Sequence, residues 1–96
     1  MKKKYSVVVE GVNIYLNRGR IERMGFFTTR WVEALKNDEA EKSAIELVKQ
    51  ELETMDVLCN SPQDPPTFSI DKVREIDSFD GFMVPGKGFS FFPDKK

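Results

Sequence analysis

The segment from Asp38 to Met55 carries apolar side chains at the spacing of an amphipathic helix, and this pattern constrains the fold more than any other in the chain. At about 100° per residue its apolar positions fall within an arc of roughly 160°, which is wide enough to face a core. The positions in this arc are Ala40, Ala44, Ile45, Leu47, Val48, Leu52 and Met55. We therefore expect a single core-facing helix here.

The ends of this helix are marked by different signals. Asn37 or Asp38 is expected as the N-cap, and Asp38 with Glu41 has the spacing of a capping box. No glycine follows the helix, so its end is expected between Met55 and Leu58, before the prolines that preclude continuation. Glu51 lies within the apolar arc and is expected to overhang the core and reach water.

The length and composition indicate one soluble domain spanning residues 1–96, with flexible ends at 1–4 and 94–96. Of the 96 residues, 40% are hydrophobic and 32% charged, a globular profile, and no apolar run is long enough to span a membrane. The lone cysteine, Cys59, cannot form an internal disulfide and is expected to be buried or half-buried. These features predict a cytoplasmic protein without membrane contacts.

Two strands are expected before the helix. In the first, from Tyr5 to Leu16, the apolar residues change parity after Gly11, and a bulge or bend at that glycine would restore one buried face. Turn residues at 17–20 then lead to a second strand from Gly25 to about Leu35, which gives an antiparallel hairpin.

After the helix, the proline-rich segment 57–66 is expected to form a loop. Thr67 to Ile76 has the pattern of a third strand, with a kink or bulge at 71–72 where the apolar parity changes. Phe89 to Phe92 is expected as a short final strand or an extended apolar arm.

Together these elements predict an α+β fold, a two-layer sandwich in β-β-α-β-β order. Its antiparallel or mixed sheet of three or four strands would be covered on one face by the helix. Outer-face residues such as Phe27, Trp31 or Tyr15 would then need cover from the C-terminal tail, a second subunit or a ligand.

The side-chain inventory argues against an enzyme. The absence of histidine excludes imidazole-based catalysis and histidine-ligated metals. Glu75 and Asp77 could form an acid–base pair, and Cys59 could be a reactive thiol, but a solvated strand face and a structural thiol are the favoured interpretations. We expect no cofactor and no metal.

Charge is unevenly distributed along the chain. Residues 1–37 hold eight basic and three acidic groups, net +5, whereas residues 38–56 hold two basic and seven acidic groups, net −5. Basic and aromatic side chains are interleaved in the hairpin, and the candidate interaction surface consists of Arg18, Arg20, Arg23, Phe27, Arg30 and Trp31.

The favoured function is a protein-interaction module that forms a homodimer or binds a protein partner. The alternative is nucleic-acid binding, which the sequence pI near 5.5 disfavours.

The run GFFTTRWVEALKNDEAEKSAIELVKQEL, a strand entering a helix through an Asn-Asp-Glu sequence, resembles small uncharacterised bacterial proteins of about this length. It is more distantly similar to the strand-to-helix segment of HicB-type antitoxin domains, although the glycine-rich segment typical of that family is absent. The resemblance implies a small α+β domain that neutralises a toxin partner or self-associates. It transfers no site residue to this chain.

Overall fold

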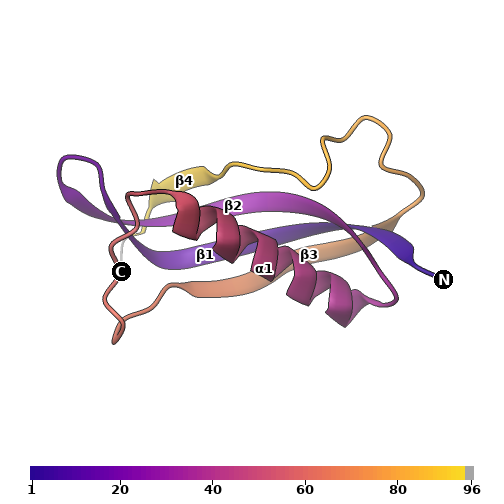
Figure 1. Cartoon of the computed structure of the whole chain (residues 1–96), viewed down its shortest axis with the longest axis horizontal. Helices are drawn as coiled ribbons and strands as arrows, with labels where there is room; N and C mark the ends of the chain where they lie inside the picture. The colour runs from indigo at the N-terminus through magenta and orange to yellow at the C-terminus, as the bar shows by residue number, and fades with distance from the viewer. Residues whose placement is uncertain (95–96) are drawn as a thin grey trace.

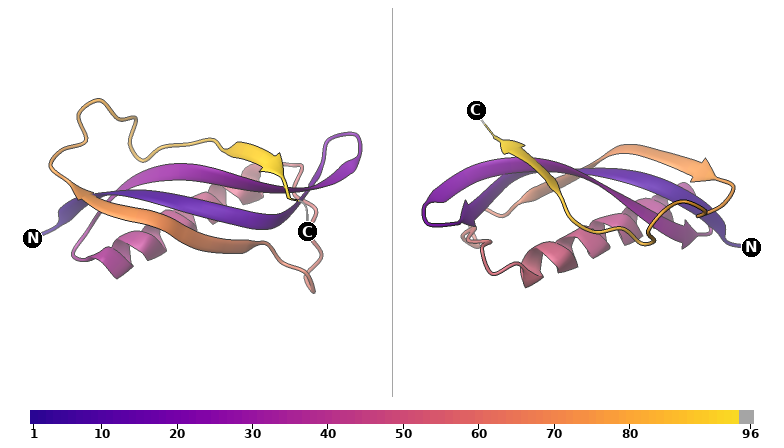
Figure 2. Two further views of the ribbon diagram at one scale, coloured as in Figure 1. Left: turned by 180° about the vertical axis from the view of Figure 1, so that it is seen from behind. Right: turned by 90° about the horizontal axis from the view of Figure 1, so that it is seen from above.

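The computed structural model describes residues 1–94 as one helix packed against an open, four-stranded antiparallel sheet (Figure 1). The elements are β1 (Lys3–Asn17), β2 (Ile21–Ala34), α1 (Asn37–Thr54), β3 (Thr67–Ile76) and β4 (Ser90–Pro93). The strands lie in the order β3-β1-β2-β4, and α1 covers one face of the sheet (Figure 2). The prediction of a small α+β domain is confirmed.

The core lies between α1 and the central strands β1 and β2. Strand alternation directs every second side chain of these strands toward the helix. The fully buried side chains in this layer include Tyr5, Val7, Val9, Phe26 and Val48. The predicted apolar arc of the helix is confirmed, because Ala40, Ala44, Val48 and Leu52 are buried while Ile45, Leu47 and Met55 pack against them.

The parity change in β1 is resolved by a β-bulge beside Gly11, as the sequence predicted. Gly11 pairs with Phe26 and Ile14 with Met24, so two residues of β1 face the single Gly25 of β2. Asn13 takes a left-handed φ of 59°. The bulge returns Ile14 and Leu16 to the core after Gly11.

The polar groups freed by this bulge find partners in distant parts of the chain. The Asn13 N–H donates to Asp94 Oδ2 at 2.8 Å, and its carbonyl accepts from Asn60 Nδ2 at 2.8 Å. The Asn13 side-chain amide donates to Asp64 Oδ1 at 2.7 Å. Because unpaired backbone groups at a partly buried site are costly, the bulge also fixes the 55–66 loop and the C-terminal end.

The other strands agree closely with expectation. β3 has the predicted bounds, and its register with β1 shifts at Asp71, where a kink was predicted. β2 begins earlier than predicted, at Ile21 rather than Gly25. Of the two alternatives for 89–92, the short final strand is the one observed: β4 spans Ser90–Pro93 and pairs with Met24–Phe27.

Residues near both ends of the chain take part in the fold. Lys3 and Lys4 belong to β1, and Asp94 accepts the Asn13 N–H. Flexible ends at 1–4 and 94–96 stay a prediction, and residues 95–96 lie outside the described residues.

The predicted N-cap, Asn37 or Asp38, is wrong. Lys36 is the N-cap and no side chain caps the helix, because the strand ends at Ala34 and only two residues connect it to α1.

The cross-strand pair of Gly11 and Phe26 is a sterically demanding contact in the sheet. A Cβ atom on Gly11 would collide with the Phe26 ring, which covers the glycine backbone. Phe26 also packs edge-on against Phe89, with ring centroids 4.7 Å apart. An aromatic ring over a strand glycine therefore connects the bulge to the C-terminal segment.

We expect Gly11→Ala to destabilise the protein by about 1–3 kcal/mol, because the added methyl group overpacks the core at Phe26. The measurement is the free energy of unfolding in urea. Since the collision is with this ring, the same substitution in a Phe26→Leu background should cost less by about 1 kcal/mol. Equal costs in both backgrounds would contradict the contact.

Candidate functional site

Arg30 is a strand residue whose side chain points into the protein. It lies on the same face of β2 as Phe26 and Thr28, toward α1, and is 1% exposed. Its guanidinium donates from Nη2 to Glu51 Oε1 at 2.7 Å, from Nη1 to the Thr29 carbonyl at 2.9 Å, and also to Thr28 Oγ1. Arg30 is therefore not part of an exposed surface, unlike the expectation from sequence.

Glu51 also departs from expectation. Its carboxylate is 29% exposed and faces inward, where it neutralises the buried guanidinium instead of standing free in water. The sequence pattern placed Glu51 in the apolar arc correctly, but the partner that makes this position favourable comes from β2, 21 residues earlier.

The same carboxylate holds the C-terminal segment. Glu51 Oε2 accepts the Gly88 N–H at 2.7 Å, and the Gly88 carbonyl accepts from Thr28 Oγ1 at 2.7 Å. The Phe89 ring lies over the Arg30 guanidinium at 5.6 Å. The ion pair thus joins β2, α1 and the segment that leads into β4.

Burial lowers the pKa of Arg30, and the nearby Glu51 charge acts in the opposite direction. A guanidinium stays protonated in proteins even when its pKa is lowered. Arg30 and Glu51 therefore form an ion pair. Each charge stabilises the other, because water reaches the Glu51 carboxylate but not the Arg30 guanidinium.

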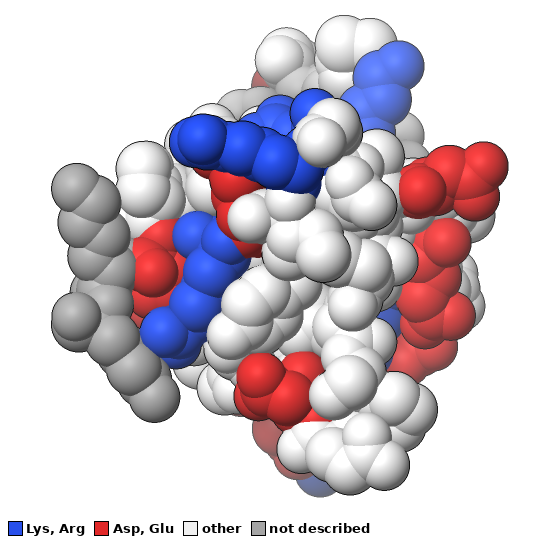
Figure 3. All heavy atoms as spheres, turned by 90° about the vertical axis from the view of Figure 1, so that its left-hand side faces the viewer, with Lys and Arg blue, Asp and Glu red and all other residues white. Residues whose placement is uncertain are grey.

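The remaining arginines of the predicted surface are paired near the β1–β2 turn and at the C-terminal end. Arg18 and Arg20 both contact Glu22, at 3.8 and 3.6 Å, and Arg23 contacts Asp94 at 3.2 Å. At this end of the molecule acidic groups stand beside basic ones (Figure 3). The structure therefore does not bring the six predicted residues together into one surface.

Phe27 and Trp31 do lie on the face of β2 opposite the helix. The chain's own C-terminal segment covers part of each: Phe92 lies against Phe27 with centroids 5.5 Å apart, and Phe82 stacks on Trp31 at 4.9 Å and 23°. The sequence predicted that the C-terminal tail, a second subunit or a ligand would cover these residues, and the C-terminal segment does so in part. Phe27 is still 39% exposed.

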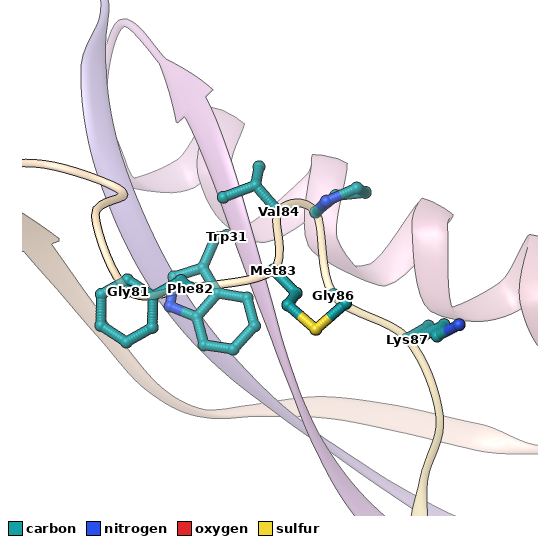
Figure 4. Close-up of a pocket in the computed structure, with 8 residues that line it drawn as sticks. Trp31, Gly81, Phe82, Met83, Val84, Gly86 and Lys87 are labelled. Carbon is teal, nitrogen blue, oxygen red and sulfur yellow. The ribbon is translucent and has the colours of Figure 1, made fainter.

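A cleft of about 630 Å³ opens around Trp31 and the loop that crosses it (Figure 4). Its apolar lining comes from β2 and from the loop between β3 and β4, namely Trp31, Phe82, Met83, Val84 and Pro85. The backbone N–H of Trp31 donates to the Pro85 carbonyl at 2.9 Å, which positions the loop at the edge of β2. Gly86, at φ 95°, lies so close to Trp31 and the Thr29 carbonyl that a Cβ would not fit.

The loop side chains of this cleft are unusually exposed for large apolar residues. Phe82 is 42% exposed, Met83 79% and Val84 44%. The Trp31 Nε1 atom, by contrast, is buried and has no hydrogen-bond partner among the described residues. Sequence reasoning missed the loop residues, although an apolar Phe-Met-Val run between two glycine turns was a visible signal.

The residues considered for catalysis do not converge. Glu75 is exposed and lies 3.7 Å from Lys3, Asp77 is exposed, and Cys59 lies in the loop after α1 at the other end of β3. Cys59 is also exposed, which corrects the prediction that it is buried or half-buried. The neighbouring Leu58 bridges to Leu16 and packs on the core, whereas the Cys59 Sγ donates to the Tyr15 carbonyl at 3.4 Å at the surface.

Residues 1–94 contain no cluster of three or more acidic or cysteine side chains that could hold a metal ion. Over the same residues, no helix has both the length and the apolar character that crossing a membrane requires.

Comparison of the chain with family models, curated proteins and solved structures finds no match. The resemblance to HicB-type antitoxin domains therefore stays a prediction.

We expect Glu51→Ala to destabilise the fold by about 2–4 kcal/mol, because it leaves the buried Arg30 charge and the Gly88 N–H without their acceptor. The free energy of unfolding in urea measures this. Glu53→Ala is the matched control, since it removes an exposed carboxylate from the same turn and should change stability by about 0.5 kcal/mol or less. Similar losses in the two variants would show that the ion pair has no special role.

Proposed function

We propose that this protein is a small interaction module without catalytic activity, which self-associates through the apolar cleft around Trp31. The observation that carries the proposal is the group of exposed loop side chains, Phe82, Met83 and Val84, beside an aromatic pair. This location replaces the arginine-bearing hairpin that the sequence suggested.

The physical reason is the free energy of apolar burial. Fully removing an exposed Phe, Met or Val side chain from water contributes about 1.5–3 kcal/mol, so a second copy that covers these residues gains a share of this in proportion to the area that is still exposed, which is largest for Met83. Contiguous exposed apolar side chains on a small protein mark interaction sites more often than scattered ones do. Because a two-fold dimer brings the same patch together from both copies, one such cleft is enough.

The geometry gives less support to nucleic-acid binding, the alternative. Arg18 and Arg20 each face Glu22, Arg23 faces Asp94, and Arg30 is buried. A polyanion would need several free cations on one surface to gain the affinity that counterion release provides. Self-association is therefore the function that these residues favour.

We expect the protein to dimerise at tens of micromolar and Met83→Lys to weaken the dimer by about tenfold or more, because a charge would be buried among apolar side chains. Sedimentation velocity over a concentration series measures both. A wild-type protein that remains monomeric up to about 100 μM would contradict the proposal.

Ile21→Lys is the matched control for this experiment. Ile21 is 63% exposed and lies at the β1–β2 turn, far along the sheet from the cleft, so the same change in charge at another exposed apolar residue should leave the dimer intact. If it weakened association as much as Met83→Lys did, the contact surface would not be the Trp31 cleft.

A further inference from the structure

A second groove, of about 430 Å³, lies between the edge of β2 and helix α1. Val32 and Glu33 line it from the strand, and Ser43, Glu46, Leu47 and Gln50 line it from the helix. Trp31 and Pro85 form the end that adjoins the first cleft. The floor of the groove is thus a strand edge, and its wall is one face of a helix.

The strand edge in this groove lacks a neighbour. β4 pairs only with Met24–Phe27, and further along β2 the backbone N–H of Trp31 donates to the Pro85 carbonyl. In an antiparallel strand the N–H and C=O of alternate residues point to the same side, so those of Glu33 point outward as those of Trp31 do. Within residues 1–94 no strand or loop pairs with Glu33 on that side.

The groove is acidic. Among its eight lining residues Glu33 and Glu46 are both exposed carboxylates, and none is basic. Lys49, on the same helix, is directed toward β3, where its Nζ lies 5.6 Å from the centre of the Phe68 ring. The groove therefore presents two carboxylates to a cationic segment, and none of its lining residues is a lysine or arginine.

The groove also has an apolar side. Leu47 is half-buried on the helix wall, and Trp31 is half-buried at the end. A strand added to the β2 edge would direct alternate side chains toward the helix and toward the opposite face of the sheet. Apolar side chains of that strand would meet Leu47, and the basic side chains between them would lie beside Glu33.

We propose that this groove binds an extended segment of a partner protein in which basic and apolar side chains alternate. The segment adds as a strand to the β2 edge at Glu33, its outward-facing cations pair with Glu33, and Glu46 on the helix wall adds to the negative potential of the groove. Strand addition supplies affinity through main-chain hydrogen bonds, while the side-chain contacts supply specificity. This proposal does not depend on self-association through the Trp31 cleft.

The probe is a fluorescein-labelled peptide of alternating Lys and Val, titrated with the full-length protein by fluorescence anisotropy at about 50 mM salt, where ionic contacts are strongest. We expect saturable binding, weakened about tenfold or more by Glu33→Lys combined with Glu46→Lys. The matched control, Glu41→Lys combined with Glu53→Lys, gives the same net-charge change outside the groove and should alter binding about twofold or less.

Two further measurements test the proposal. The same peptide with N-methyl groups at alternate residues should bind about fivefold more weakly or worse, because it lacks the N–H donors that strand addition needs. The Met83→Lys variant should retain peptide binding, which separates this groove from the self-association surface. No binding at about 500 μM peptide, equal effects of both double variants, or equal binding of the methylated peptide would overturn the proposal.

Discussion

The arrangement of this protein depends on one buried cation. Arg30 occupies a core position on the central hairpin, where a guanidinium without a partner would cost more free energy than a small domain can spare. Glu51 resolves this by reaching in from the helix, and its second oxygen fixes Gly88. A single carboxylate therefore connects the helix end to the segment that follows β3, and the Trp31 cleft and the β2–α1 groove both lie next to this ion pair.

Much of the fold could be predicted because local patterns and tertiary packing agree. The helix arc, the bounds of β3, and the bulge after Gly11 follow from periodicity, since a change of apolar parity in a half-buried strand has few physical solutions. The helix start was predicted wrongly, because here the local signal and the tertiary geometry disagree. The short connection from Ala34 overrode the capping preference of Asp38, because tertiary geometry decides where local signals are weak.

The candidate site was less accessible from sequence. In sequence, Arg30 has no feature that distinguishes it from an exposed strand arginine. Its burial depends on the contact with Glu51, which lies on a different element, and no local pattern predicts that contact. Cys59 shows the same limit, because its exposure depends on Leu58 pairing with Leu16. The stacking of Phe82 on Trp31 joins residues 51 positions apart through a loop without regular structure, whose path periodicity cannot describe.

The outer edge of β3, on the side away from β1, determines whether a second copy of the strand can pair there. Two copies of this strand, paired antiparallel about Val73, would set Lys72 against Arg74 and Asp71 against Glu75, like charge opposite like charge on both faces. The register shift at Asp71 also disturbs the straight ladder that continuous pairing requires. In this register the outer edge of β3 therefore resists pairing with a second copy of itself, whereas β2 keeps an unpaired edge at Glu33 on the other side of the sheet.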